Sequence, residues 1–191
     1  INICMDPKLS EQFFVRDNEE KDFGVLIDLT YRCALECPRC QRQEFFRDHG
    51  EKVWGEDIPL DTIEKATDIF KAINFGGQLS DPIHHPHFIE ILKLCYDKGV
   101  HTNIATASTG KPKSWFIKAF EANPNARWQF GIDGLPEESH KYRVNQDGQK
   151  LFDIMCEAKN YLNKTPRWQY IVFKYNEEHI EQAKFMAKEK G

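Results

Sequence analysis

Three cysteines in one short segment carry the clearest chemical signal in the sequence. Cys33, Cys37 and Cys40 follow one another at the spacing C-x3-C-x2-C, directly after the apolar run at 25–29. Thiolates this close together on an irregular backbone can converge on one inorganic centre, which is how cysteine holds iron–sulfur clusters. Three thiolates leave one iron of a four-iron cluster without a protein ligand. The pattern therefore predicts a [4Fe–4S] cluster with one open iron, where a substrate can bind.

Two other interpretations of the triplet stay open at this point. A structural zinc ion could use the three thiolates with the nearby His49, because Cys3His sites are common. Zinc sites, however, usually show two short ligand pairs far apart in the sequence, whereas this segment has one asymmetric triplet. Chance clustering of unrelated thiols is the other alternative. The remaining cysteines are isolated and are expected to act as small buried hydrophobes: Cys4, Cys95 and Cys156.

The elements that position the cysteines alternate between strand and helix. Short apolar runs predict strands, and apolar residues at helical spacing predict helices. A capping-box pattern predicts that Asp61 caps the first helix, and Pro86 is expected to open the second. Residues 41–59 are expected to form a long polar loop. The predicted strands are 25–29, 73–77, 100–105, 127–132 and 167–174, and the predicted helices are 61–72, 86–99, 114–122, 151–162 and 180–187.

This alternation predicts an α/β fold with parallel strands joined by right-handed crossovers. In barrels of that kind, active residues gather at the carboxyl ends of the strands. The cysteine segment follows the first predicted strand, Gly76 and Gly77 end the second, and Asp133 and Gly134 follow the fourth. We therefore expect these three features to lie on one face of the fold.

From about Phe23 onward, the sequence resembles the core of the radical S-adenosylmethionine (SAM) superfamily, in its molybdenum-cofactor and peptide-maturase branch. The resemblance implies a partial (β/α) barrel of about five to six βα units, in which Cys33, Cys37 and Cys40 hold the cluster. It places the core domain at 23–191, and the turn-forming and charged residues of 1–22 predict an N-terminal extension or lid. The family's sixth strand has no counterpart before Gly191, so we expect residues beyond Gly191 to supply the strand that closes the sheet.

The resemblance also implies a set of SAM contacts. Gly76, Gly77 and Gln78 fall on the family's glycine-glycine-glutamate strand end, whose backbone holds the amino group of SAM. Glycine suits that task because it lets the main chain approach a ligand without an intervening side chain. Arg143 would pair with the SAM carboxylate through its planar guanidinium. The other positions that the resemblance places near SAM are Thr106, Ser108, Asp133 and Val172.

Three positions depart from the family pattern. Arg39 stands where an aromatic residue usually precedes the last cysteine, Gln78 replaces the glutamate, and Gly131 replaces a frequent serine. None of the three is a cluster ligand.

A histidine-rich segment is a candidate for a second metal site. His84, His85 and His87 follow Asp81 there. Histidines at the start of a helix serve capping and surface roles more often than metal binding, so no second metal is predicted. His84 and Asp81 remain candidates for facing the substrate.

The activity implied by the resemblance is reductive cleavage of SAM to methionine and a 5′-deoxyadenosyl radical. That radical removes a hydrogen atom from a substrate, which the sequence leaves open among a peptide, a nucleoside and a small metabolite. The enzyme would be an oxidoreductase or transferase that takes electrons from a flavodoxin- or ferredoxin-like donor. A zinc-binding protein, or a cluster-bearing but inactive relative, is the alternative on the same fold.

Composition limits the remaining classes of partner. The chain has 191 residues, 40% of them hydrophobic, and a formal net charge of −4 without blocks of like charge. These values suit one globular domain and give no electrostatic reason to expect a nucleic-acid or membrane partner. No apolar run approaches a membrane span of roughly 18 residues, and no secretory leader is visible. Isolated thiols beside a reactive triplet suit a reducing cytoplasm, which is the predicted location.

Overall fold

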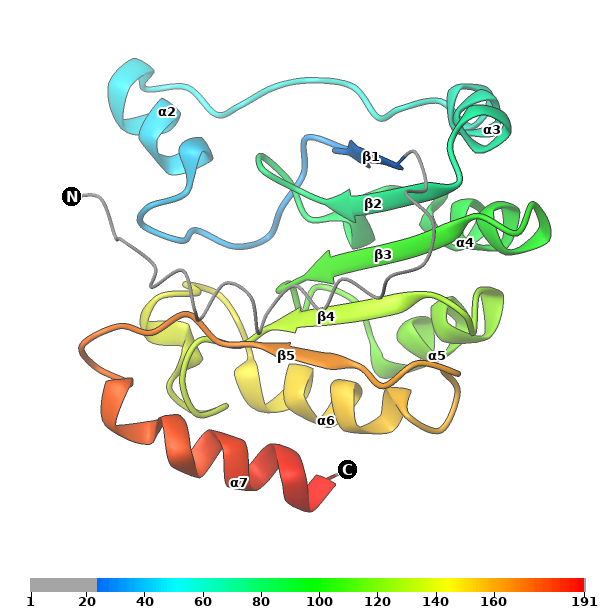
Figure 1. The fold of residues 1–191 in the computed structure, drawn as a ribbon. Coiled ribbons are helices and arrows are strands. Elements are labelled where there is room, and N and C mark those ends of the chain that lie inside the picture. Colours follow the sequence, from blue (N-terminus) through cyan, green and yellow to red (C-terminus); the bar gives the residue numbers. More distant parts are fainter. Residues whose placement is uncertain (1–23, 191) are drawn as a thin grey trace.

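A five-stranded parallel sheet forms the centre of the computed structural model, which describes residues 24–190. The strands follow one another across the sheet in chain order, and each pairs in parallel with the next (Figure 1). The predicted α/β fold with parallel strands is therefore confirmed. The predicted extension at 1–22, Cys4 and Gly191 lie outside the described residues. The strands are β1 (Gly24–Ile27), β2 (Ala72–Gly76), β3 (His101–Thr106), β4 (Arg127–Gly131) and β5 (Arg167–Gln169).

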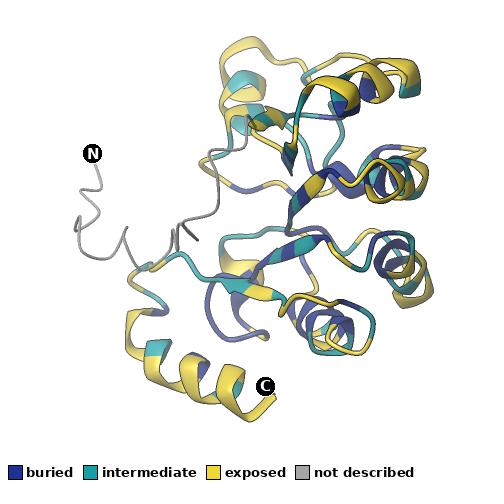
Figure 2. Ribbon diagram, turned by 45° about the vertical axis from the view of Figure 1, so that its right-hand side comes forward, coloured by how far each residue is buried: buried dark blue, intermediate teal, exposed yellow. Residues whose placement is uncertain are grey.

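Helices cover one face of this sheet. Figure 2 shows α4 and α5 turning their buried sides toward the strands and their exposed sides outward. No helix within residues 24–190 is long and apolar enough to cross a membrane. The helices are α2 (Gln41–His49), α3 (Leu60–Ile69), α4 (Phe88–Asp97), α5 (Lys113–Ala122), α6 (Gly148–Ala158) and α7 (Ile180–Lys190), with short 3₁₀ turns η1 (Pro82–His84), η2 (Ser139–Lys141) and η3 (Glu177–His179).

The core lies between the sheet and the helices. Successive strand residues point to opposite faces, so every second side chain faces the helices. Trp128 and Phe130 of β4 are buried there, and the Trp128 ring meets the ring of Phe120 edge-on at a centroid distance of 5.1 Å. The intervening side chains point to the other face, which we call the open face. It carries these polar residues: Asn74, Asn103, Arg127, Gln129, Arg167 and Gln169.

Residues 41–49 form helix α2, where the sequence predicted a polar loop. Gln, Arg and Glu are good helix formers, and Gly50 ends the helix in the left-handed conformation with φ 71°. The backbone N–H of Gly50 donates to the carbonyl of Phe46 at 2.8 Å. The helix buries no residue, so it has no apolar stripe. The spacing of apolar residues in the sequence therefore gives no sign of this helix.

Two predicted helix starts are wrong in detail. Pro59 is the N-cap of α3, and Asp61 sits in the first turn, where it pairs with Lys65 at 3.4 Å instead of capping the helix. Helix α4 begins at Phe88 and not at Pro86.

Strand β5 is also shorter than predicted and ends at Gln169. The backbone N–H of Ile171 donates to the carboxylate of Asp133 at 2.8 Å. This side-chain bond takes the place of a further ladder bond.

Candidate functional site

The three predicted cluster ligands lie together at the carboxyl edge of the sheet. The chain leaves β1 and enters an irregular loop in which Cys33, Cys37 and Cys40 gather around Leu35 and Ala107. The backbone N–H of Cys40 donates to the carbonyl of Cys37 at 2.9 Å, which tightens the turn between them. All three thiols are free of disulfides. The structure thus brings together the three residues that the sequence singled out, and we call this group the cysteine cluster.

Side chains from α2 and the following segment anchor this loop. Arg42 of α2 donates to the carbonyl of Tyr31 and, at 2.9 Å, to the carbonyl of Leu79 beyond β2. Thr30 donates to Asp57 at 2.6 Å. The buried Nε of Arg42 has no hydrogen-bond partner among residues 24–190. The loop is therefore attached both to its own helix and to the neighbouring strand end.

Burial and nearby charges set the protonation of the thiols. Burial raises the pKa of Cys33 to about 12, with the Asp81 carboxylate adding to the rise. Burial also raises the pKa of Cys37, while Arg143 opposes that rise and lies within hydrogen-bonding reach of the sulfur. Arg42 likewise favours the thiolate of Cys33. Two guanidinium groups next to buried thiols suit a centre that binds thiolates, because they offset the negative charge.

The geometry argues against the zinc interpretation. His49 lies at the exposed end of α2, where its Nδ1 is 3.0 Å from the carbonyl of Phe45 and its ring stacks on Phe45. It belongs to that helix and not to the cysteine cluster. Across residues 24–190, no three side chains of His, Cys, Asp or Glu converge on a position for a single metal ion. The ligands of a four-iron cluster bind different irons, so the thiols do not need to meet at one point.

The strand end at Gly76 and Gly77 is held by Asp28, which follows β1. Its carboxylate accepts from the backbone N–H groups of Gln78 at 3.1 Å and Leu79 at 3.0 Å. A Cβ on Gly77 would lie 1.8 Å from the carbonyl oxygen of Ser80, so the turn itself requires glycine. A Cβ on Gly76 would come no closer than 3.4 Å to another atom. Contact of these residues with SAM stays a prediction, and only Gly76 can test it without breaking the turn.

We expect Gly77→Ala and Gly76→Ala to differ sharply in stability. The first should lower the free energy of unfolding by about 1–3 kcal/mol, because the new methyl group overlaps the Ser80 backbone. The second should stay within about 0.5 kcal/mol of the wild type. Urea denaturation of both variants measures the difference. Equal stabilities would show that the turn can rearrange around a side chain.

Asp81 organises the carboxyl end of β3. Its buried carboxylate accepts from the hydroxyl of Thr106 at 2.9 Å, and from the backbone N–H groups of Ala107 at 2.8 Å and Ser108 at 2.9 Å. The hydroxyl of Ser108 is 2.8 Å from Nε2 of His84. Thr106 and Ser108 therefore lie at the predicted edge, but both hydroxyls already have partners within the protein. Their contact with SAM remains a prediction.

Arg143 and Asp133 form an ion pair beside the cysteine cluster. Nε of Arg143 donates to Asp133 at 2.6 Å, and Asp133 is fully buried. The other carboxylate oxygen of Asp133 accepts from Ile171, so this side chain positions Arg143 and the end of β5. A Cβ on Gly131 would lie 3.1 Å from Nη2 of Arg143, so the glycine at this position leaves room for the guanidinium. Val172 lies beyond β5 and is 52% exposed.

Gln146 is a site residue that the sequence analysis missed. Its buried amide donates to the carbonyls of Ala107 at 2.6 Å and Gly131 at 2.8 Å, and it accepts from the hydroxyl of Ser139. It therefore joins the ends of β3 and β4 next to the cysteine cluster. A single glutamine in an irregular segment gives no sequence signal of this role.

This chain is similar in sequence to curated proteins over part of its length. No family model matches the sequence. Among curated proteins, the chain is similar to the PqqA peptide cyclase of Bradyrhizobium diazoefficiens, with 26% identity over 93 residues. It is also similar to the tungsten-containing aldehyde ferredoxin oxidoreductase cofactor-modifying protein of Pyrococcus furiosus, with 29% identity over 86 residues. Each match covers 44% of this chain, but only 22% and 24% of the respective relatives.

Solved structures share the fold over most of the chain. SuiB of Streptococcus suis bound to its precursor peptide SuiA matches 88% of this chain and 37% of its own, with a TM-score of 0.70 and 14% identity. The protein anSMEcpe with bound AdoMet matches 88% of this chain and 47% of its own, with a TM-score of 0.61 and 16% identity. Methylornithine synthase (PylB) matches 78% of this chain and 44% of its own, with a TM-score of 0.56 and 14% identity. The shared fold confirms the partial barrel.

Proposed function

We propose that this chain is the core of a radical SAM enzyme that acts on a peptide. The observation that carries the proposal is the grouping of three thiols with the Arg143–Asp133 pair at the carboxyl edge of a parallel sheet. Cys33, Cys37 and Cys40 would hold a [4Fe–4S] cluster. With SAM bound, the cluster would supply the one electron that cleaves SAM to methionine and a 5′-deoxyadenosyl radical, for removal of a hydrogen atom from the substrate.

The chain's own residues bind and orient SAM in this proposal. Arg143 bonds to Asp133 through Nε and lies within hydrogen-bonding reach of the Cys37 sulfur. Its planar guanidinium fork suits a carboxylate. Asp133 fixes the direction of that fork from a fully buried position. Gly76 lies at the same edge and has no side chain to keep a ligand from its backbone. The irregular loop and α2 would keep water away from the reacting groups.

The choice of a peptide rests on two relatives. The PqqA peptide cyclase acts on a peptide by its name, and SuiB is described as bound to a precursor peptide. This chain spans less than a quarter of the curated relatives and less than half of these structures, so we transfer the substrate class only as a proposal. The electron donor would be flavodoxin- or ferredoxin-like, as the chemistry requires.

The proposal predicts reductive cleavage of SAM by the reconstituted chain. The protein should be loaded with iron and sulfide without oxygen, then mixed with SAM and dithionite. We expect 5′-deoxyadenosine and methionine to accumulate in equal amounts, as measured by liquid chromatography and mass spectrometry. The matched control replaces all three cluster cysteines with alanine and should produce neither compound. A colourless protein that binds one zinc ion would refute the proposal, and a brown protein that leaves SAM intact would identify an inactive relative.

A further inference from the structure

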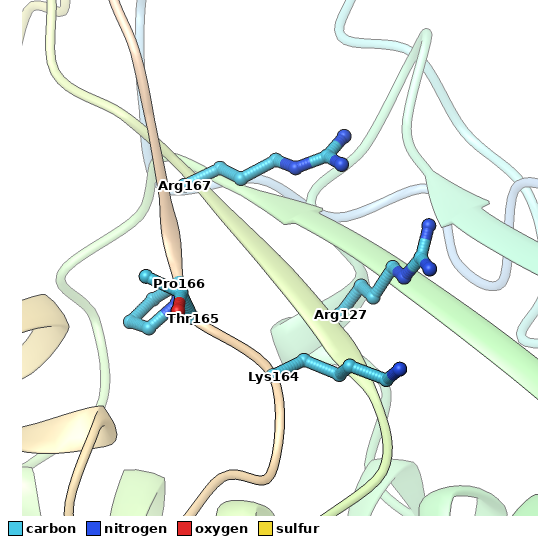
Figure 3. Close-up of a pocket in the computed structure, with 5 residues that line it drawn as sticks. All are labelled: Arg127, Lys164, Thr165, Pro166 and Arg167. Carbon is cyan, nitrogen blue, oxygen red and sulfur yellow. The ribbon is translucent and has the colours of Figure 1, made fainter. Parts of the chain in front are cut away.

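A basic pocket lies on the open face, at the amino ends of β4 and β5. Figure 3 shows Arg127, Lys164 and Arg167 around it, with their charged ends extending to the same side of the sheet. Thr165 and Pro166 complete the lining, and the open pocket has a volume of about 270 Å³. Two of these cations come from neighbouring strands, and the third comes from the segment that leads into β5. The pocket is thus part of the sheet's own surface.

Among residues 24–190, the lining of the pocket contains cationic residues and no anionic one. Neither Lys164 nor Arg167 has an ion pair or a side-chain hydrogen bond with any residue in 24–190. Like charges held near one another repel, and a bound anion relieves that repulsion. Arginine in particular offers a fork that matches a carboxylate. The chemistry of the pocket therefore favours a ligand with an anionic group of carboxylate type.

The same face links this pocket to the cysteine cluster. Arg127 begins β4 and Gly131 ends it, four residues later. At about 3.3 Å per residue, the strand spans about 13 Å between them. Gly131 lies against Arg143 and Ala107, and Ala107 packs with the cysteine cluster. An extended molecule seated in the basic pocket would therefore reach the proposed reaction edge after about 13 Å.

Amide side chains lie along this path. Gln129 pairs in register with Arg167, and Gln169 pairs in register with Gly131. Both side chains are half-buried on the open face, and neither has a side-chain hydrogen bond among residues 24–190. A primary amide both donates and accepts, so it can bond to the N–H and C=O groups of an extended peptide. The amides of Gln129 and Gln169 could thus bond to a peptide backbone between the basic pocket and the cysteine cluster.

We propose that Lys164 and Arg167 bind a carboxylate of an extended peptide substrate, about four residues from the residue that reacts at the cysteine edge. The inference rests on the proposed function, because it takes the cysteine edge as the place of reaction. It adds a property of the substrate, namely an acidic residue, or the peptide's own carboxyl terminus, at a fixed distance from the modified residue. Arg127 lines the same pocket.

Binding of matched peptides to the full chain tests this inference. The probes are acetylated, amidated octapeptides of glycine and alanine that contain one glutamate or, in the twin, one glutamine. Calorimetric titration should show the glutamate peptide binding about 5–10-fold more tightly at low salt, with the advantage shrinking as salt rises. The Nε–H resonance of Arg167 in a ¹⁵N spectrum should shift with the glutamate peptide and not with its twin.

Variants assign the effect to the pocket. Arg167→Gln and Lys164→Gln should each remove most of the preference for glutamate, whereas Lys118→Gln on the outer side of α5 should leave it unchanged. All three variants should still bind iron and cleave SAM. Equal binding of the two peptides to the wild type, or an unchanged preference in both pocket variants, would overturn the inference and leave the proposed function standing. Failure of the wild type to hold a cluster would instead overturn the proposed function, whatever the peptides do.

Discussion

Replacing Cys33, Cys37 or Cys40 with alanine should abolish the visible absorbance of the reconstituted iron–sulfur cluster. The three thiols form one group at the carboxyl end of β1, and no other cysteine of residues 24–190 belongs to it. Each variant should lose nearly all bound iron, because the two remaining thiolates cannot hold a four-iron cluster. Iron and sulfide per chain, measured after anaerobic reconstitution, give the result.

Two other cysteines supply matched controls. Cys95 is buried within α4 in the main core, and Cys156 lies on α6 next to the same core. Cys95→Ala removes a buried sulfur and should cost about 1 kcal/mol of stability, but both variants should keep full iron content. If either control lost its iron while one of the three cluster variants kept it, the ligand assignment would be wrong.

Arg143→Gln should destabilise the folded chain by about 3–5 kcal/mol at neutral pH, because it leaves the buried Asp133 carboxylate without its counter-charge. Burial raises the pKa of Asp133, and Arg143 opposes that rise. Without Arg143, the pKa of Asp133 in the folded state lies still further above its pKa in the unfolded chain. The folded variant then holds a proton that the unfolded chain releases, so its stability falls as pH rises through the folded pKa. Urea denaturation should therefore show that Arg143→Gln loses more unfolding free energy, relative to the wild type, at pH 7.5 than at about pH 5.

A second substitution separates charge from packing in this prediction. Asp133→Asn combined with Arg143→Gln removes the buried charge together with its partner, and it should recover more than half of the lost stability. SAM affinity should stay low in the double variant, because the guanidinium fork is still absent. A deficit that does not change with pH and is not recovered in the double variant would mean that Arg143 acts through packing alone.

The sequence predicted the order of elements and the position of the cysteine cluster because both depend on local pattern. Alternating apolar runs and helical stripes are read over fewer than 20 residues, and the cysteines fall within eight residues of one another. The five strands appeared in the expected order, and the features after β1, β2 and β4 meet at one edge.

The hydrogen bonds that hold this edge together were not predictable in the same way. Asp28 bonds to residues about 50 positions away, Asp81 to residues about 25 away, and Gln146 to a carbonyl 39 away. Such bonds depend on which strands become neighbours, and a lone polar residue shows no periodicity. The end of β5 was unpredictable for the same reason, because it depends on the hydrogen bond that Asp133 accepts from the N–H of Ile171. Helix α2 was not predicted for a different reason, which is that it has no buried face.

The missing buried face of α2 affects how the proposed cluster could be assembled. Helix α2 starts directly after Cys40, and its arginines Arg42 and Arg47 bond to carbonyls outside the helix. Helices with few buried apolar contacts open locally at a small fraction of the global unfolding free energy. We therefore expect the segment after Cys40 to detach and return while the sheet stays intact. Such an opening gives iron and sulfide access to thiols that are otherwise partly buried, so the cluster can be inserted into a chain that has already folded.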